Sequence, residues 1–132
     1  MNSIKSPGGS IYPYYYKGGE IHCLKYGSFY ANKDSLFALM KKEEEFILDK
    51  KRRISIWVDF YKTKLTNEVI TEFVNSICRL APSISKLSIV GCSTIAKWKI
   101  LRQLKNTNEL LPLKFFVDPE DAKTWLVSER IQ

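Results

Sequence analysis

The stretch Arg53-Ile54-Ser55-Ile56-Trp57-Val58-Asp59-Phe60 decides the fold that we expect for this chain. Its β-branched and aromatic residues favour a strand, and it lies between the basic block 50–53 and the polar turn 61–64. Apolar residues occupy nearly every position, which is typical of a strand buried on both faces of a parallel sheet. We therefore predict a central strand whose carboxyl end carries Asp59, at the edge where open α/β sheets place their functional loops.

Strand and helix patterns alternate on both sides of this segment. Good N-cap residues begin the helical stretches, and Pro82 ends one of them. Asp118 followed by Pro119 is a preferred pair for a helix start. The predicted helices begin after Asn32 or Asp34, after Thr66, after Ser93 or Thr94, and after Asp118, and the further strands cover 86–90 and 113–117.

The N-terminal part predicts a leader followed by a hairpin. Residues 1–10 are polar and rich in glycine, so we expect a flexible leader there. Strands over 11–16 and 21–26 flank the pair Gly18-Gly19, which suits a tight two-residue turn, and Pro13 restricts the first strand to a sheet edge. Strict alternation would place Tyr12, Tyr14 and Tyr16 on one face of that strand and Tyr15 on the other.

This order of elements predicts a single α/β domain over residues 11–132. We expect one mixed, mostly parallel five-stranded sheet with an antiparallel edge hairpin and about four helices, because strands that alternate with helices imply right-handed crossovers. The 132 residues, 45% hydrophobic and 27% charged, suit one ordinary globular domain.

Composition also limits the classes of function. The net charge of +7 permits an anionic partner but does not require one, since modest positive charge often serves solubility. Three widely spaced cysteines, Cys23, Cys78 and Cys92, favour buried reduced thiols, and Cys92 is the one that a helix N-terminus could activate. No signal-peptide core and no apolar run near the roughly 20 residues of a membrane span is visible, so we expect a cytoplasmic protein.

Several features resemble the STAS domains, the fold of bacterial anti-anti-sigma factors and of the tails of sulfate transporters. They are the element order, Gly27 after a strand, the strands 54–60 and 87–91, and the ending FFVDPEDAKTWL over 115–126. That ending is similar to the STAS-related branch of small bacterial proteins, which are also compared with lipid-binding CRAL-TRIO domains. The resemblance covers about residues 11–128.

The resemblance implies a regulatory role, with partner binding through the loop after the central strand. The Asp-Ser-Ser/Thr-Gly phosphorylation motif of the anti-anti-sigma factors is absent from residues 61–67. Thr66 occupies a similar place, where a phosphate would meet the exposed N–H groups of a helix, and N-capping is the simpler role for it. The residues implied in partner binding are Asp59, Tyr61, Thr63, Thr66 and Asn67.

No catalytic constellation is visible. His22 is the only histidine and lies in a predicted edge strand without a nucleophile motif, and no phosphate-binding or zinc motif is present. Asp59 and Asp118 both lie at the carboxyl ends of predicted parallel strands and could share a metal, but a loop contact for Asp59 and a helix cap for Asp118 are the simpler roles. We therefore expect a non-enzymatic protein without a metal or a cofactor.

Two surfaces give further hypotheses. Basic residues on the helix after Ser93 form a candidate anion-binding face around Trp98, which we expect to point inward. The tyrosines of the first strand could serve a protein interface or a homodimer. Our first hypothesis is a protein-interaction module; the second is binding of a small apolar or anionic ligand, and the third, less favoured, is nucleic-acid binding. The basic residues are Lys97, Lys99, Arg102 and Lys105.

Overall fold

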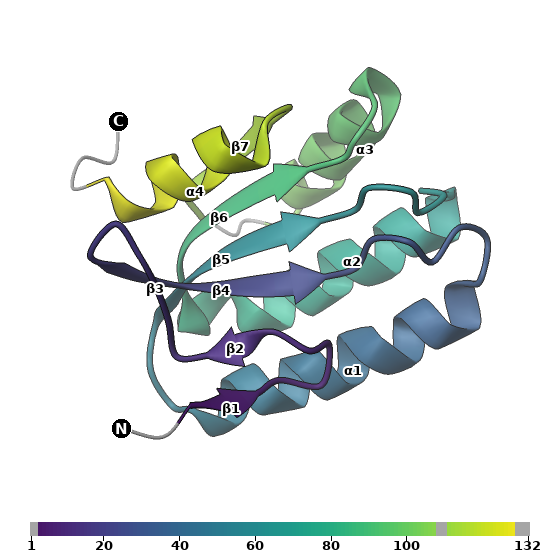
Figure 1. Ribbon diagram of the computed structural model, residues 1–132. Coiled ribbons are helices and arrows are strands. Elements are labelled where there is room, and N and C mark those ends of the chain that lie inside the picture. The colour runs from purple at the N-terminus through teal and green to yellow at the C-terminus, as the bar shows by residue number, and fades with distance from the viewer. Residues whose placement is uncertain (1–2, 108–110, 129–132) are drawn as a thin grey trace.

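The computed structural model describes residues 3–107 and 111–128, which form an α/β fold (Figure 1). A two-stranded antiparallel sheet pairs β1 with β2, and a five-stranded sheet has the order β3-β4-β5-β6-β7. Within the five-stranded sheet of the described residues, β3 pairs antiparallel with β4 and the other neighbouring strands are parallel. The predicted fold class is thus confirmed. The strands are β1 Ile4–Lys5, β2 Ile11–Tyr12, β3 Tyr14–Tyr16, β4 Gly19–Lys25, β5 Ile54–Asp59, β6 Ile84–Val90 and β7 Leu113–Phe116; the helices are α1 Lys33–Asp49, α2 Asn67–Leu80, α3 Thr94–Lys105 and α4 Pro119–Val127, with a 3-10 turn at Ala81–Ser83.

The helix starts follow the local signals in the sequence. Asn32, Thr66 and Ser93 each accept a hydrogen bond from a backbone N–H of the first helical turn. Asp118 does the same for α4, with Pro119 as the first helical residue. Each cap satisfies a donor that the helix itself leaves open, which is why these positions could be predicted.

The three crossover helices cover one face of the sheet, and α4 lies on the other. The parallel strands follow one another in a single direction, so right-handed connections place α1, α2 and α3 on the same side. Figure 1 shows α2 behind β4 and β5, α1 behind β1 and β2, and α4 in front of the five-stranded sheet. Ala122 and Leu126 of α4 are buried but stand outside the main apolar cluster, which contains Ala96 and Ile100 of α3.

This one-sided arrangement corrects the expectation for the central strand. In β5 only Ile54, Ile56 and Val58 are buried, whereas Ser55, Trp57 and Asp59 on the other face are half exposed. The short α4 covers only part of that face. The strand is therefore not buried on both faces, and Trp57 faces a region that the helices leave partly open.

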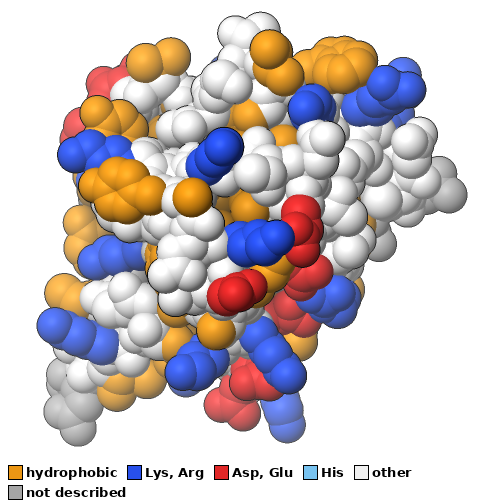
Figure 2. Space-filling view, turned by 90° about the vertical axis from the view of Figure 1, so that its right-hand side faces the viewer, with side chains coloured by type: hydrophobic (Ala, Val, Ile, Leu, Met, Phe, Trp, Pro, Cys, Tyr) orange, Lys and Arg blue, Asp and Glu red, His pale blue; other side chains and the backbone are white. Residues whose placement is uncertain are grey.

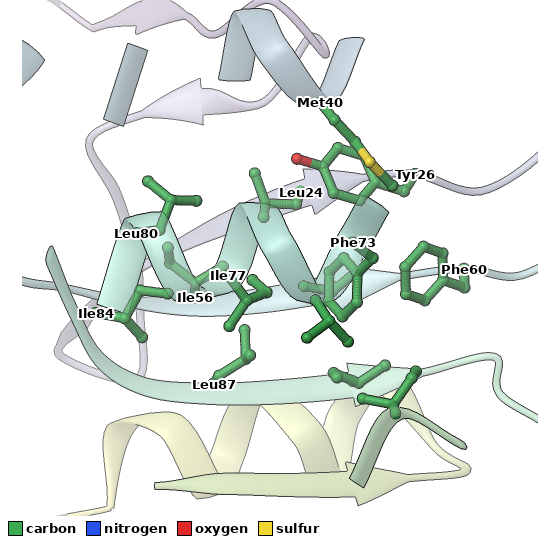
Figure 3. Close-up of a cluster of buried hydrophobic side chains, with 14 of the residues drawn as sticks. Leu24, Tyr26, Met40, Ile56, Phe60, Phe73, Ile77, Leu80, Ile84 and Leu87 are labelled. Carbon is green, nitrogen blue, oxygen red and sulfur yellow. The ribbon is translucent and has the colours of Figure 1, made fainter. Parts of the chain in front are cut away.

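The main core lies between the sheet and the three crossover helices (Figure 3). Phe60 and Phe73 meet edge to face with ring centroids 4.8 Å apart, and Tyr26 contacts both rings. Edge-to-face geometry is a favourable arrangement for aromatic rings and fixes their relative orientation. The carboxyl ends of β4 and β5 are thereby anchored to α2 directly below the loops that follow them.

The N-terminal segment is not a free leader over residues 3–10. Ile4 and Lys5 pair with β2, and Ser6 and Ser10 are buried. The anchor is Glu43 of α1, whose Oε2 accepts hydrogen bonds from Ser6 Oγ at 2.7 Å and from the Gly8 backbone N–H at 2.9 Å. Its Oε1 lies 3.1 Å from His22 Nε2, and neither side chain is exposed. Residues 1–2 lie outside the described part of the chain.

The hairpin differs from the prediction in two details. The residues with positive φ are Lys17 and Gly18, while Gly19 begins β4 and approaches Val127 so closely that a Cβ there would lie 2.7 Å from its Cγ1. The first strand also breaks at Pro13. Tyr12 therefore packs against Phe46 of α1, whereas Tyr16 donates a hydrogen bond to Glu120 of α4, and the two tyrosines lie on opposite faces of the sheet.

Candidate functional site

Two loops at the carboxyl ends of β4 and β5 form one continuous backbone structure. Ser28 N donates to Tyr61 O at 2.7 Å, Tyr30 N donates to Lys62 O at 2.9 Å, and Lys64 N donates to Tyr30 O at 2.7 Å. Thr63 adds side-chain bonds, because its Oγ1 accepts from Phe29 N and donates to Tyr26 O. We call residues 28–30 and 61–64 the two-loop platform.

Two glycines allow the neighbouring backbone to approach this platform. A Cβ at Gly27 would lie 2.6 Å from Tyr61 O, and a Cβ at Gly91 would lie 2.5 Å from Tyr61 N. Gly91 follows β6 and also has a φ of +88°. Since a side chain would collide with backbone atoms at both positions, glycine is required for Tyr61 to sit between the two connections.

Uncommon backbone conformations gather in the platform. Ser28, Tyr30 and Lys62 have φ values of 64°, 53° and 63°, in the left-handed region that non-glycine residues seldom adopt. Such conformations cost free energy and persist where the surrounding structure holds them, often at functional sites. Here the hydrogen bonds between the two loops hold them.

The platform presents two tyrosine side chains to solvent. Tyr30 is 63% exposed and Tyr61 is 64% exposed. Lys62 and Lys64 are exposed beside them, and Lys62 Nζ lies 5.7 Å from the centre of the Tyr61 ring. Figure 2 views the molecule from this end, where exposed hydrophobic side chains lie among lysine and arginine side chains, with aspartate and glutamate side chains on the same face. The platform residues themselves, Tyr30, Tyr61, Lys62 and Lys64, are aromatic and basic and lie on a firmly bonded backbone.

The residues predicted for partner binding lie close together but differ in role. Asp59 Oδ1 accepts from Tyr61 N and orders the start of the loop. Thr63 holds the two loops together, and Thr66 Oγ1 caps α2 by accepting from Val69 N. Asn67 accepts a hydrogen bond from Lys99 Nζ at 2.7 Å. Of the five, Tyr61 is the one whose side chain is mainly free to contact a partner.

A groove of about 380 Å³ lies between the N-terminal ends of α1 and α2, beside the platform. Tyr30 and Thr66 line it, and Lys33 and Glu68 form an ion pair across these helix ends at 2.7 Å. Glu68 raises the pKa of Lys33 through this hydrogen bond. The groove therefore already holds a matched pair of charges.

The basic residues of α3 do not form a single face. Lys97 lies over the ring of Phe115 in β7, whereas Lys99 bonds to Asn67 of α2 on the opposite flank. Arg102 lies over the ring of Trp98, and that ring is 56% exposed. The prediction that Trp98 points inward is wrong, because Ala96 and Ile100 make the buried side of α3 instead. Lys105 is exposed near the end of α3.

The side chains that could support catalysis are either buried or on strands that are not neighbours. His22 is fully buried against Glu43. Burial raises the pKa of Cys92 to about 12, so the helix N-terminus does not activate that thiol. Asp59 ends β5 and Asp118 follows β7, and β6 lies between these two strands. Within residues 3–107 and 111–128, no group of three or more metal-binding side chains is present.

Tyr30 is the main platform residue that the sequence pattern did not indicate. It lies beside Phe29 in a short loop before a helix cap, where two adjacent aromatic residues give no periodic signal. Its role depends on the bonds to Lys62 and Lys64, which are more than thirty positions away. The sequence feature that could have indicated this loop is Gly27, because a glycine after a strand often allows another backbone segment to approach closely.

Comparison with protein-family models, with curated proteins and with solved structures finds no match for this chain. Among the described helices, none has the length and apolar character needed to cross a membrane.

Proposed function

We propose that the chain is a non-enzymatic, STAS-like regulatory module that binds a protein partner through the two-loop platform and the start of α2. The observation that carries the proposal is the pair of exposed tyrosines, Tyr30 and Tyr61, on loops that are bonded to each other and held in uncommon conformations. Tyrosine is enriched among the residues that dominate binding energy in protein interfaces.

The charges beside the tyrosines indicate the chemistry of the partner. Lys62 and Lys64 are exposed and make no ion pair with another described residue. A partner surface with acidic side chains would complement them, and such complementarity raises the association rate and selects among partners. The rigid backbone also lowers the ordering cost of binding.

Within this proposal, Thr66 is a phosphoacceptor. Its hydroxyl caps α2 and borders the groove between the helix ends. A phosphate at that position would gain from the helix N–H groups and would change the charge beside the platform by about two units. Partner binding that responds to phosphorylation of Thr66 would follow from this placement.

Photo-crosslinking tests the proposed surface directly. A chain with benzoylphenylalanine in place of Lys62 should form a discrete covalent product with one partner in cells, because position 62 lies beside both platform tyrosines. A matched chain with the same group in place of Tyr15, which is also exposed but lies in β3, should not form that product.

Two tyrosine variants complete the test. In the crosslinking chain, Tyr30→Ala together with Tyr61→Ala should reduce the yield about ten-fold or more, as expected when central aromatic contacts are removed. An equal yield with and without the two tyrosines, or the same product from position 15, would exclude the platform as the binding surface.

A further inference from the structure

A separate cavity of about 340 Å³ lies on the sheet face that α1, α2 and α3 leave open. Its walls come from α4 on one side and from the β1–β2 segment on the other. The cavity follows from the topology, since successive crossovers in one direction leave the opposite face to α4 alone. Its volume is in the range of pockets that bind small molecules.

The floor of the cavity is apolar and aromatic. Cys23 of β4 and Trp57 of β5 are paired neighbours in the sheet, and Tyr14 lies beside them across the β3–β4 hairpin. Burial raises the pKa of Cys23 to about 12, so its thiol is uncharged at neutral pH. The floor therefore offers flat, neutral surfaces suited to an aromatic group.

The rim of the cavity is basic. Lys5, Lys25 and Lys123 line it, each from a different element or strand end. Lys123 Nζ lies 5.2 Å from the ring centre of Trp57 and 3.4 Å from Glu120 Oε1. Lys25 Nζ is 3.5 Å from Gly9 O, and the Lys5 ammonium group makes no hydrogen bond or ion pair with any described residue.

Carboxylates do not cancel this charge inside the cavity. None lines it; of the three lysines only Lys123 pairs with a carboxylate among the described residues, that of Glu120. Asp59 lies in an adjoining hollow that shares Cys23, Lys25 and Trp57. Three ammonium groups above a neutral aromatic floor complement a ligand that is anionic at one end and flat and apolar at the other.

We propose that this cavity is a binding site for a small organic anion with an aromatic body. The site lies on a different face of the sheet from α1 and α2, and it draws none of its lining from the two-loop platform. The adjoining hollow, which shares Cys23, Lys25 and Trp57 with the cavity, is lined by Ser28 and Tyr61 of the platform, so the two sites are neighbours with different lining residues.

A pair of matched probes tests the proposal. 8-Anilino-1-naphthalenesulfonate carries an anionic group on an aromatic body, and N-phenyl-1-naphthylamine has the same body without the charge. Titration of the folded chain, followed by calorimetry and by tryptophan fluorescence, should show saturable one-site binding of the sulfonate, about ten-fold tighter than that of the neutral amine. Equal affinities for the two probes, or no saturable binding of the sulfonate, would overturn the proposal.

Variants locate the binding within the cavity. Lys25→Met and Lys123→Met keep the apolar stem of each side chain, and each should weaken sulfonate binding about three- to five-fold without a change in circular dichroism. Lys41→Met on the exposed face of α1 is the matched control and should leave the affinity unchanged. Trp57→Leu should weaken the binding of both probes, because it removes an aromatic surface from the floor of the cavity. If the two rim variants bind the sulfonate as tightly as the Lys41→Met control, the cavity is not its site.

Discussion

Replacing Glu43 by Ala lowers the free energy of unfolding by about 3–5 kcal/mol, the range expected when one member of a buried polar network is removed. The carboxylate accepts hydrogen bonds from Ser6 Oγ and Gly8 N and contacts His22; Ser6 and His22 are buried, and Gly8 is half-buried. The buried Ser6 and His22 groups would lose this partner away from water, which is more costly than the loss of the bonds alone. Urea unfolding followed by circular dichroism measures the change.

Two further variants distinguish the loss of the buried hydrogen bonds of Glu43 from the effect of any Glu-to-Ala change in α1. Glu45→Ala, on the exposed side of the same helix, should change stability by less than about 0.5 kcal/mol. Glu43→Gln keeps the shape but replaces one acceptor oxygen with a donor, so its effect should lie between the two. A Glu43→Ala variant as stable as Glu45→Ala would show that the N-terminal segment is not anchored through this carboxylate.

Replacing Gly91 by Ala is expected to lower the free energy of unfolding by about 2–4 kcal/mol. The residue has a φ of +88°, and its Cβ would lie 2.5 Å from Tyr61 N and 2.8 Å from the Phe60 carbonyl carbon. Backbone atoms cannot move aside as the end of a flexible side chain can. The start of the two-loop platform would have to shift, so Gly91→Ala should also disturb the Tyr61 environment in NMR spectra.

Gly9 provides a matched control for this prediction. Its φ of +93° is nearly the same, but no atom lies within 4 Å of the position that a Cβ would take. Gly9→Ala should therefore show only the cost of a left-handed conformation, about 1–2 kcal/mol. If both variants lower the free energy of unfolding by the same amount, the close approach of Gly91 to Tyr61 does not add to the cost of a side chain at position 91.

Local signals in the sequence predicted the element order and the helix caps well. Thr66 and Asp118 act through hydrogen bonds to residues a few positions away, so their roles are visible in a short window. The composition of β5 was also enough to identify a central strand. It could not show whether one face or both are covered, because that depends on the direction in which the later strands are added.

Contacts between segments far apart in the sequence account for the remaining differences between the predictions and the structure. Glu43 stands in a run of three glutamates that reads as a solvated surface, and only the fold brings Ser6 and Gly8 to it. Trp98 was expected to point inward from a basic face, but small Ala96 and branched Ile100 fill the buried side of α3. The sequence placed Tyr61 in the candidate site, whereas Tyr30 joined it through backbone pairing with residues 62–64.

The central claim is that Tyr30 and Tyr61 form a partner-binding surface, and native mass spectrometry tests it most directly. The chain would be isolated from its own cells without denaturation, in wild-type form, as the Tyr30→Ala/Tyr61→Ala variant and as the Tyr15→Ala control. We predict a complex with a second protein for the wild type and the control, and a bare chain for the double variant. A complex that the double variant retains, or a wild-type chain without any protein partner, would contradict the claim.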